Sequence, residues 1–316
     1  MKIIITGSAG FIGYHLAKNL LKNKRNQVLG IDSINSYYSK TVKNLRIKLL
    51  KKNKNFIFKK TNLVNESKID LIFKKFKPEA VFHIAGQPGV LYSFKNPKSY
   101  KKNNIDATKI ISLVTKKYDV KKFIFASSSS VYGDQKKFPI KENFKLNPKN
   151  YYAQTKLKCE EIINKNFLFS NTKYIMYRFF TVYGPLGRPD MFIHKFLNSI
   201  KHKKKIYMHN NGLNYRDFTF IDDLIKILIM TLKKMPKRKL LNICRSKPIK
   251  TTKLVSLINK IYGYKQELVN TGFVRGEMLK THGCNKLLKS NFKRIKFFDI
   301  EYGLKKTISA FKKFGY

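Results

Sequence analysis

Apolar residues in the first 180 positions or so form short continuous runs, separated by segments with helical spacing. We interpret the short runs as buried strands: Lys2–Thr6, Gln27–Ile31, Phe56–Lys59, Ala80–Ile84, Lys122–Ala126 and Lys173–Tyr177. Helices are expected between them: Phe11–Leu21, Thr41–Leu50, Ser67–Phe76, Ser99–Lys117 and Tyr152–Phe167. Alternating strands and helices predict a parallel α/β sheet that is doubly wound and covered on both faces.

After Phe179 the pattern changes to loop residues and shorter helices, near 191–201, 222–233, 251–262 and 304–314. We expect residues 1–178 to form the sheet domain, with a return segment at about 217–243. Residues 179–216 and 244–316 would form a smaller, mostly helical substrate-binding cap.

The composition raises the question of a nucleic-acid partner. The chain has 316 residues, with 67 Lys and Arg against 18 Asp and Glu, for a net charge of +49. Only nine of the basic residues are arginines, however, and the lysines are spread along the whole chain. Base and phosphate recognition favours the planar fork of Arg. We therefore attribute the charge to a nucleotide-biased genome and predict no nucleic-acid partner.

Other features indicate a cytoplasmic protein without a metal or a membrane insertion. No apolar run is long enough to span a bilayer, and the chain enters its first strand directly at Lys2. Cys159, Cys244 and Cys284 lie far apart without CxxC spacing, so neither a zinc site nor a disulfide framework is expected.

A glycine-rich turn joins the first strand to the first helix. Its three glycines (Gly7, Gly10 and Gly13) would allow a tight turn, a close approach of backbone to a pyrophosphate, and close helix–sheet packing. The spacing is G-x-x-G-x-x-G instead of the commoner G-x-G-x-x-G. Phe11 and Ile12 lie within this turn, which predicts a dinucleotide site.

Polar or small residues also follow the next strands, where parallel sheets place their ligands. Asp32 ends the second strand, and its carboxylate would accept hydrogen bonds from ribose hydroxyls and repel a 2′-phosphate, which favours NAD over NADP. Further candidates at the ends of the third and fourth strands are Asn62, Leu63, Ala85, Gly86 and Gln87.

Tyr152 and Lys156 are four residues apart, so they share one face of the predicted helix. A tyrosine that works as a base at neutral pH needs a nearby positive charge to favour its phenolate form, and Lys156 would supply it. In a chain with 18 Tyr this pair alone is weak evidence. The hydroxyls of Ser128, Ser129 and Ser130, at the end of the fifth strand, would face the same crevice.

Together these residues resemble the extended short-chain dehydrogenase/reductase superfamily with its Rossmann fold, and within it the UDP-glucuronate 4-epimerases among the nucleotide-sugar epimerases. The likeness runs through seven segments in order: Thr6–Gly13, Gly30–Tyr38, His83–Ser93, Ser127–Gly133, Tyr152–Lys156, Arg178–Met191 and Tyr215–Asp223. The resemblance implies a transient oxidation at sugar C4 with tightly bound NAD, most simply converting UDP-glucuronate to UDP-galacturonate.

The resemblance also implies roles for single residues. Tyr152 would be the base, Lys156 its activator and ribose ligand, and Ser128 the assisting hydroxyl. Asn104 and Phe180 would contact the cofactor. The substrate-side positions would be Ser129, Ser130, Thr181, Arg188, Arg216 and Arg275. Arg188, Arg216 and Arg178 persist as arginines in a lysine-rich chain, and bidentate binding of a diphosphate or carboxylate is a physical reason for that.

The residues after Ser128 fit the reactions of related enzymes less well than epimerisation. The related dehydratases carry an Asp–Glu pair after the catalytic hydroxyl, and the related decarboxylases carry a Glu, where this chain has Ser129 and Ser130. One departure from the epimerase pattern is Leu91, which stands where that family usually has Arg. Two alternatives stay open: 4-epimerisation of a neutral sugar (UDP-glucose or UDP-N-acetylglucosamine), and a non-catalytic NAD-binding sensor. The resemblance also implies a homodimer formed through a four-helix bundle of the helices near 99–117 and 152–167.

Overall fold

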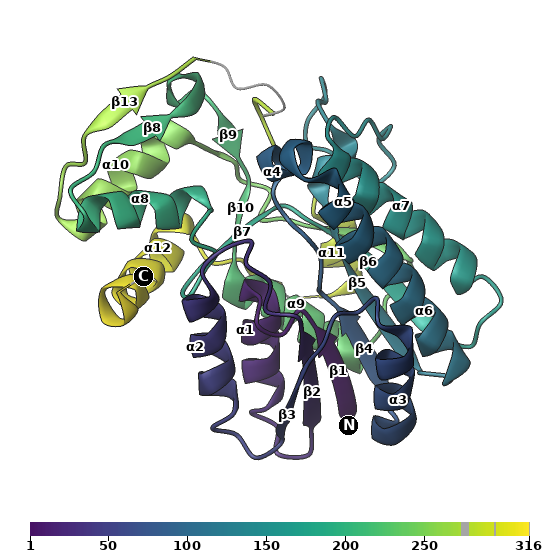
Figure 1. The fold of residues 1–316 in the computed structure, drawn as a ribbon. Coiled ribbons are helices and arrows are strands. Elements are labelled where there is room, and N and C mark those ends of the chain that lie inside the picture. The colour runs from purple at the N-terminus through teal and green to yellow at the C-terminus, as the bar shows by residue number, and fades with distance from the viewer. Residues whose placement is uncertain (273–277, 294, 316) are drawn as a thin grey trace.

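The computed structural model describes residues 1–272, 278–293 and 295–315. At its centre lies a sheet of seven strands, paired in parallel in the order β11-β6-β5-β4-β1-β2-β3 (Figure 1). Their bounds are β1 (Lys2–Thr6), β2 (Gln27–Asp32), β3 (Phe56–Lys60), β4 (Ala80–His83), β5 (Lys122–Ser128), β6 (Lys173–Phe179) and β11 (Leu240–Ile243). The chain winds outward from β1 to β3 and then returns to β4 on the other side of β1, so the doubly wound fold is confirmed.

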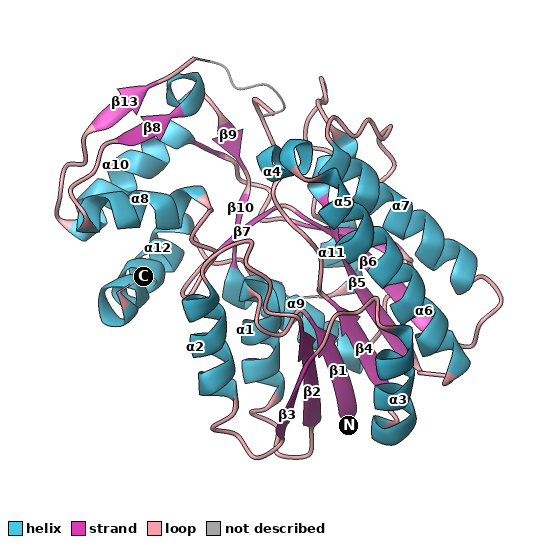
Figure 2. Ribbon diagram, in the orientation of Figure 1, coloured by secondary structure: helices cyan, strands magenta, loops and turns pink. Residues whose placement is uncertain are grey.

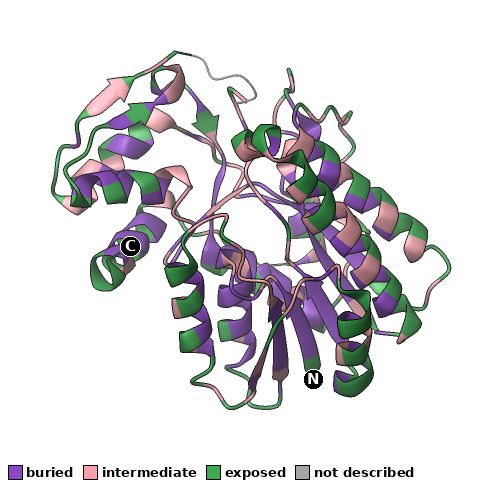
Figure 3. Cartoon of the chain, in the orientation of Figure 1, coloured by how far each residue is buried: buried purple, intermediate pink, exposed green. Residues whose placement is uncertain are grey.

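Helices cover both faces of this sheet (Figure 2). The helices α1 (Phe11–Leu20), α2 (Lys40–Leu50) and α9 (Ile221–Lys233) pack on one face, and α3 (Glu66–Phe76), α6 (Ala107–Lys117) and α7 (Tyr151–Asn166) pack on the other. Ile3 and Ile5 of β1 belong to the first apolar core and Ile4 to the second. Figure 3 shows that the central strands are buried. Because both of their faces are buried, β1, β4 and β5 contain unbroken apolar runs.

The long helix expected at 99–117 is interrupted. It comprises α5 (Pro97–Tyr100), a π-helical segment (Lys101–Asp106) and α6. The side chain of Asn96 caps the start of α5 by accepting a hydrogen bond from the Ser99 N–H at 3.2 Å. Such π-helical insertions often occur at functional sites.

The segments predicted to form the cap contain α8 (Phe192–Lys201), α10 (Thr251–Tyr262) and α12 (Ile300–Phe314). Shorter helices are α4 (Val90–Lys95) before α5 and α11 (Lys286–Asn291) before α12. Three two-stranded sheets were not expected from the sequence: β7 (Thr181–Tyr183) with β10 (Phe218–Phe220), β9 (Tyr215–Arg216) with β12 (Ile249–Lys250), and β8 (Ile206–Met208) with β13 (Leu268–Asn270). Strands of two or three residues are too short to show the alternation of apolar and polar positions by which a strand is recognised in a sequence. The predicted division into two domains stays a prediction.

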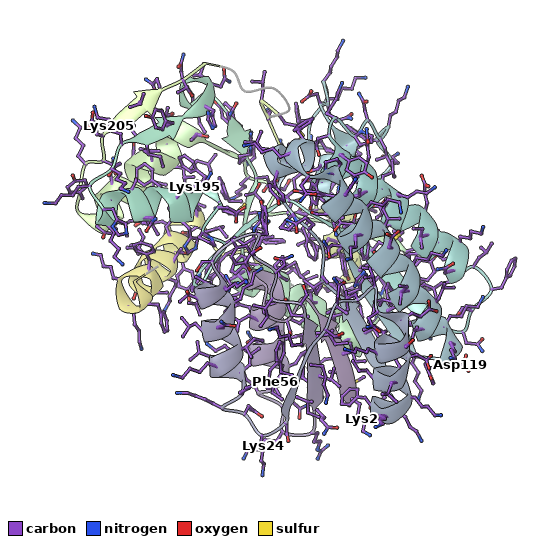
Figure 4. The ribbon with its side chains drawn as sticks, viewed as in Figure 1. Lys2, Lys24, Phe56, Asp119, Lys195 and Lys205 are labelled. Atoms are coloured by element: carbon purple, nitrogen blue, oxygen red, sulfur yellow. The ribbon has the colours of Figure 1, made fainter. Side chains whose placement is uncertain are left out.

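The surface is densely covered with lysine side chains. In Figure 4, Lys24 at one end of the molecule and Lys195 and Lys205 on the cap all extend outward. No helix in the described ranges is long and apolar enough to cross a membrane.

Candidate active site

A cavity of about 420 Å³ opens at the carboxyl ends of the sheet strands. Almost all of the residues predicted to contact the cofactor line it: Gly7, Gly10, Phe11, Ile12, Gly13, Asp32, Asn62, Leu63, Ala85, Gly86, Gln87 and Phe180. The residues predicted for the reaction and for substrate binding line the same cavity: Ser128, Ser129, Ser130, Tyr152, Lys156, Thr181, Arg188 and Arg216. The structure thus brings both groups together.

The glycine turn is packed too tightly for side chains. Gly7 has a φ of +73°, and a Cβ atom there would lie 2.8 Å from the Cα of Ala85. A Cβ at Gly13 would lie only 2.2 Å from the carbonyl oxygen of Gly7. The first turn of α1 is therefore pressed against the glycine turn, with its N–H groups directed at the cavity end. This cradle fits the pyrophosphate of a dinucleotide.

Asp32 lies beside this cradle and is half-buried. Its carboxylate accepts hydrogen bonds from the N–H groups of Ala9 (3.1 Å) and Ile34 (2.8 Å). Burial raises the pKa of Asp32 despite these bonds. Lys43 also lines the cavity, where its Nζ donates to the side chain of Asn35 at 2.7 Å, and burial lowers its pKa to about 8. Sequence reasoning missed Lys43, because one lysine among so many carries no signal.

Arg46 is a second residue that sequence reasoning missed. Its side chain is fully buried and donates to the carbonyl oxygen of Ala9 (2.9 Å) in the glycine turn. It also donates to the carbonyls of Leu186 (2.7 Å) and Gly187 (2.8 Å) in the cap. Arg46 therefore connects the cofactor cradle to the loop that contains Leu186 and Gly187. The rarity of arginine in this chain, which drew attention to Arg188 and Arg216, applies equally to Arg46.

Tyr152 and Lys156 lie on α7, which begins at an Asn150 cap that accepts from the Ala153 N–H at 2.9 Å. The buried ammonium group of Lys156 donates to the carbonyl oxygen of Ala126 at 2.7 Å. The Tyr152 ring meets the ring of Tyr100 edge-on, with centroids 6.2 Å apart. These contacts hold a phenol and an ammonium group in the wall of one cavity.

The predicted serines form another part of that wall. β5 ends at Ser128, and a 3-10 turn (Ser129–Tyr132) follows it directly. The Ser128 hydroxyl donates to the Ser130 hydroxyl at 3.1 Å and accepts from the Ser130 N–H at 3.2 Å. The site thus offers a cluster of small hydroxyl groups at the end of the strand.

The predicted arginines have different surroundings. Arg188 forms a bidentate pair with Asp190, at 3.1 and 2.5 Å, and Asp190 also accepts from the Tyr37 hydroxyl at 3.0 Å. Arg216 donates to the carbonyl oxygens of Tyr215 (3.0 Å) and Leu279 (3.3 Å) at the cavity edge. The guanidinium group of Arg188 is therefore held by a carboxylate of the protein while it lines the cavity.

Among the predicted site residues that the structure describes, Asn104 does not line the cavity. Asn104 is buried behind the wall, where it accepts from the Gln87 N–H at 2.6 Å and donates to Thr155 at 2.9 Å. It therefore braces the loop after β4, and its predicted contact with the cofactor stays a prediction. Arg275 lies outside the described residues. Leu91 is 47% exposed on α4, outside the cavity lining.

Comparison with known proteins agrees with this geometry. The profile of the NAD dependent epimerase/dehydratase family matches residues 3–244, about three quarters of the chain. The chain belongs to this family. The glycine cradle and Asp32 of this family member fit the NAD on which the family depends. In the described parts of the chain, no cluster of His, Cys, Asp or Glu could hold a metal ion.

Individual relatives are similar over nearly the full length. A UDP-glucuronate 4-epimerase of Thermodesulfobacterium geofontis is 34% identical, over 97% of this chain and 94% of that protein. The crystal structure of the UDP-glucuronic acid 4-epimerase of Bacillus cereus with UDP-glucuronic acid and NAD is 30% identical, with a TM-score of 0.93 over 99% of both chains. The UDP-glucose 4-epimerase of Thermotoga maritima with UDP-glucose is 27% identical, with a TM-score of 0.89 over 99% of both chains.

Proposed function

We propose that this protein interconverts UDP-glucuronate and UDP-galacturonate by epimerisation at C4. The observation that carries the proposal is the shared cavity. A pyrophosphate cradle and Asp32 lie at one end, Tyr152 and Lys156 in its wall, and a cluster of serine hydroxyls beside them. The similarity to two UDP-glucuronate 4-epimerases over nearly the whole chain supports the choice of sugar.

In the proposed reaction, the phenolate of Tyr152 takes the proton from the C4 hydroxyl. Lys156, held against the Ala126 carbonyl, supplies the positive charge that favours this phenolate. NAD held by the glycine cradle and Asp32 would supply the reversible hydride chemistry that oxidises C4 to a keto group and then reduces it with the opposite configuration. Ser128 donates a hydrogen bond to the reacting oxygen, and the closed wall orients the groups toward one another.

The serine cluster also bears on which sugar is bound. Ser129 and Ser130 add hydroxyl groups that can donate hydrogen bonds to a glucuronate carboxylate without repelling it, as an acidic side chain would. Arg188 and Arg216 are proposed to bind the diphosphate. A neutral sugar is the second candidate, because Leu91 replaces the Arg of the usual epimerase pattern and the chain is also similar to a UDP-glucose 4-epimerase.

The test is to incubate the purified protein with UDP-glucuronate, UDP-glucose or UDP-N-acetylglucosamine, without added NAD, and to separate the products by chromatography. Formation of UDP-galacturonate at the highest kcat/KM supports the proposal. Preferential conversion of a neutral sugar would move the assignment to the second candidate. Bound NAD without turnover of any of the three sugars would support a sensor instead.

We also propose a cytoplasmic homodimer without a nucleic-acid partner. The expected bundle would join α6 and α7 of two copies, and near them Leu113 on α6 is 40% exposed and Phe94 on α4 is 54% exposed. All three cysteines are free, which fits a reducing compartment. Sedimentation of the wild type and of Leu113→Glu would test the dimer, because a charge in the bundle should shift the protein toward monomer.

A further inference from the structure

A buried ion pair lies next to the part of the cavity wall that carries Tyr152, Lys156 and Ser128. The side chains of Glu160 on α7 and Arg178 on β6 are only 5% and 3% exposed. Arg178 binds the carboxylate with two nitrogens, Nε to Oε1 at 3.0 Å and Nη2 to Oε2 at 2.6 Å. The hydroxyl of Ser127 donates to the same Oε1 at 2.5 Å. The carboxylate of Glu160 therefore connects helix α7 to two neighbouring strands, in which Ser127 and Arg178 lie directly opposite each other.

This ion pair holds both ends of the segment Ser127–Tyr132, which we call the serine segment. At its start, Ser127 is bound by Glu160. At its end, the guanidinium carbon of Arg178 lies 4.7 Å from the centroid of the Tyr132 ring, whose hydroxyl donates to Asn242 at 2.7 Å. The hydroxyls that line the cavity lie between these two fixed points.

The same carboxylate lies on the helix that carries the proposed base. Tyr152, Lys156 and Glu160 follow one another at intervals of four residues, so they share one face of α7. Tyr152 is on this helix, whereas Ser128 is on β5. The reaction needs these two groups at a fixed separation, and the Glu160 contacts span that gap, together with the bond from Lys156 to the Ala126 carbonyl.

Stability alone is a weak reason to bury such a pair, because the cost of desolvating two charges often cancels their attraction. Directional hydrogen bonds, in contrast, prevent the sliding that apolar contacts would allow. We propose that Glu160, with Arg178 and Ser127, is a positioning unit that sets the placement of the serine segment relative to Tyr152. The inference rests on the proposed function, since it concerns the geometry of that reaction.

The main test is Glu160→Gln, which keeps the shape of the side chain and removes its charge. We expect kcat for UDP-glucuronate to fall about 10- to 100-fold, because small displacements of reacting groups cost that much. The amount of bound NAD should change little, since the cofactor cradle is elsewhere. KM should rise less than kcat falls, because the proposed diphosphate ligands Arg188 and Arg216 are unchanged. Rates are measured per NAD-loaded protein, well below each variant's melting temperature.

Ser127→Ala is a milder variant that keeps the ion pair, so it remains informative if Glu160→Gln does not fold. We expect a fall in kcat of about tenfold from losing one bond to a charged group, and recovery in Ser127→Thr, which retains the hydroxyl. The double variant should lose less than the two single losses combined, because both changes act on the same hydrogen-bonded unit. Additive losses would show that the two residues do not act as one unit.

Glu161→Gln is the matched control. Glu161 is the next residue on α7, and its 55% exposed side chain pairs with Lys158 at the surface, so full activity is expected. If Glu160→Gln lowers only the melting temperature and leaves kcat unchanged, the ion pair is merely structural and the inference is wrong. A wild-type protein that converts no UDP-glucuronate would instead refute the proposed function, and this inference with it.

Discussion

The two ends of the cavity are built in different ways. The cofactor end consists of segments that directly follow β1, β2, β3 and β4. Its glycines leave no room for a Cβ atom, at Gly13 because of the Gly7 carbonyl and at Gly7 because of the loop after β4. The substrate end combines the end of β5 with separate cap segments that carry Thr181, Arg188 and Arg216.

The forces that hold the two ends also differ. The cofactor end depends on the absence of side chains, whereas the substrate end depends on side-chain contacts such as the Tyr37–Asp190–Arg188 cluster. Asp217 is another example, with its carboxylate accepting from the N–H groups of Ser246 and Gly283 at 3.1 and 3.0 Å. A fold can therefore keep its cofactor cradle while a few side chains in the cap change the sugar that it accepts.

The largest effect is expected where the two ends meet. Tyr152→Phe removes the proposed proton acceptor and should lower kcat by about 10²–10⁴-fold, the usual contribution of a positioned base. Bound NAD and the melting temperature should stay as in the wild type. The matched control is Tyr151→Phe, one residue earlier and outside the cavity lining. Retained turnover in Tyr152→Phe would remove this residue from the mechanism.

A substitution at the cofactor end of the cavity is expected to reduce the binding of NAD. In Gly13→Ala the new methyl group would overlap the Gly7 carbonyl oxygen, so we expect loss of bound NAD and a free energy of unfolding lower by about 1–3 kcal/mol. The NAD content is read from the absorbance of the denatured protein. Gly272→Ala is the control, because its methyl group would meet no described atom within 4 Å. Normal NAD content in Gly13→Ala would contradict the tight packing of the cradle.

A change at the substrate end should leave NAD in place. Arg188→Lys keeps the charge but loses the planar fork, and we expect KM for the UDP-sugar to rise about tenfold, as for one bond to a charged group. The exposed Arg25→Lys provides the control. Equal effects of Arg188→Lys on KM and on NAD content would mean that the two ends are not independent.

The smallest effect concerns stability and pH. Burial raises the pKa of Asp217 from 3.8 to about 6. Between these values the folded protein holds a proton that the unfolded chain has lost, so this residue stabilises the fold at low pH and its contribution falls as pH rises. The slope is at most about 1.4 kcal/mol per pH unit. Asp217→Asn should remove this part of the pH dependence, measured by denaturant unfolding from pH 4 to 7, whereas the exposed Asp134→Asn should not.

Local sequence patterns predicted the residues whose role depends on their own strand, turn or helix. Each of the six expected strands agrees with the structure to within two residues, and the glycine turn lies where it was expected. The sequence did not reveal the roles of residues that bind partners far away along the chain. Arg178 persists as an arginine for bidentate binding, as argued, but it binds the carboxylate of Glu160 within the protein. Asn104 braces the loop at Gln87, a role that the sequence did not reveal, and its expected contact with the cofactor stays a prediction.

The sequence by itself determined six of the seven strands of the sheet, the dinucleotide cradle and the Tyr152–Lys156 pair, because strand burial, glycine spacing and helical periodicity are properties of neighbouring residues. Only the tertiary structure decided which buried polar groups form hydrogen bonds with each other. Arg46 is 140 residues from Leu186, and Ser127 is 33 residues from Glu160, yet each pair is hydrogen-bonded. Such pairings depend on how helices and strands pack in three dimensions, and no local periodicity encodes them.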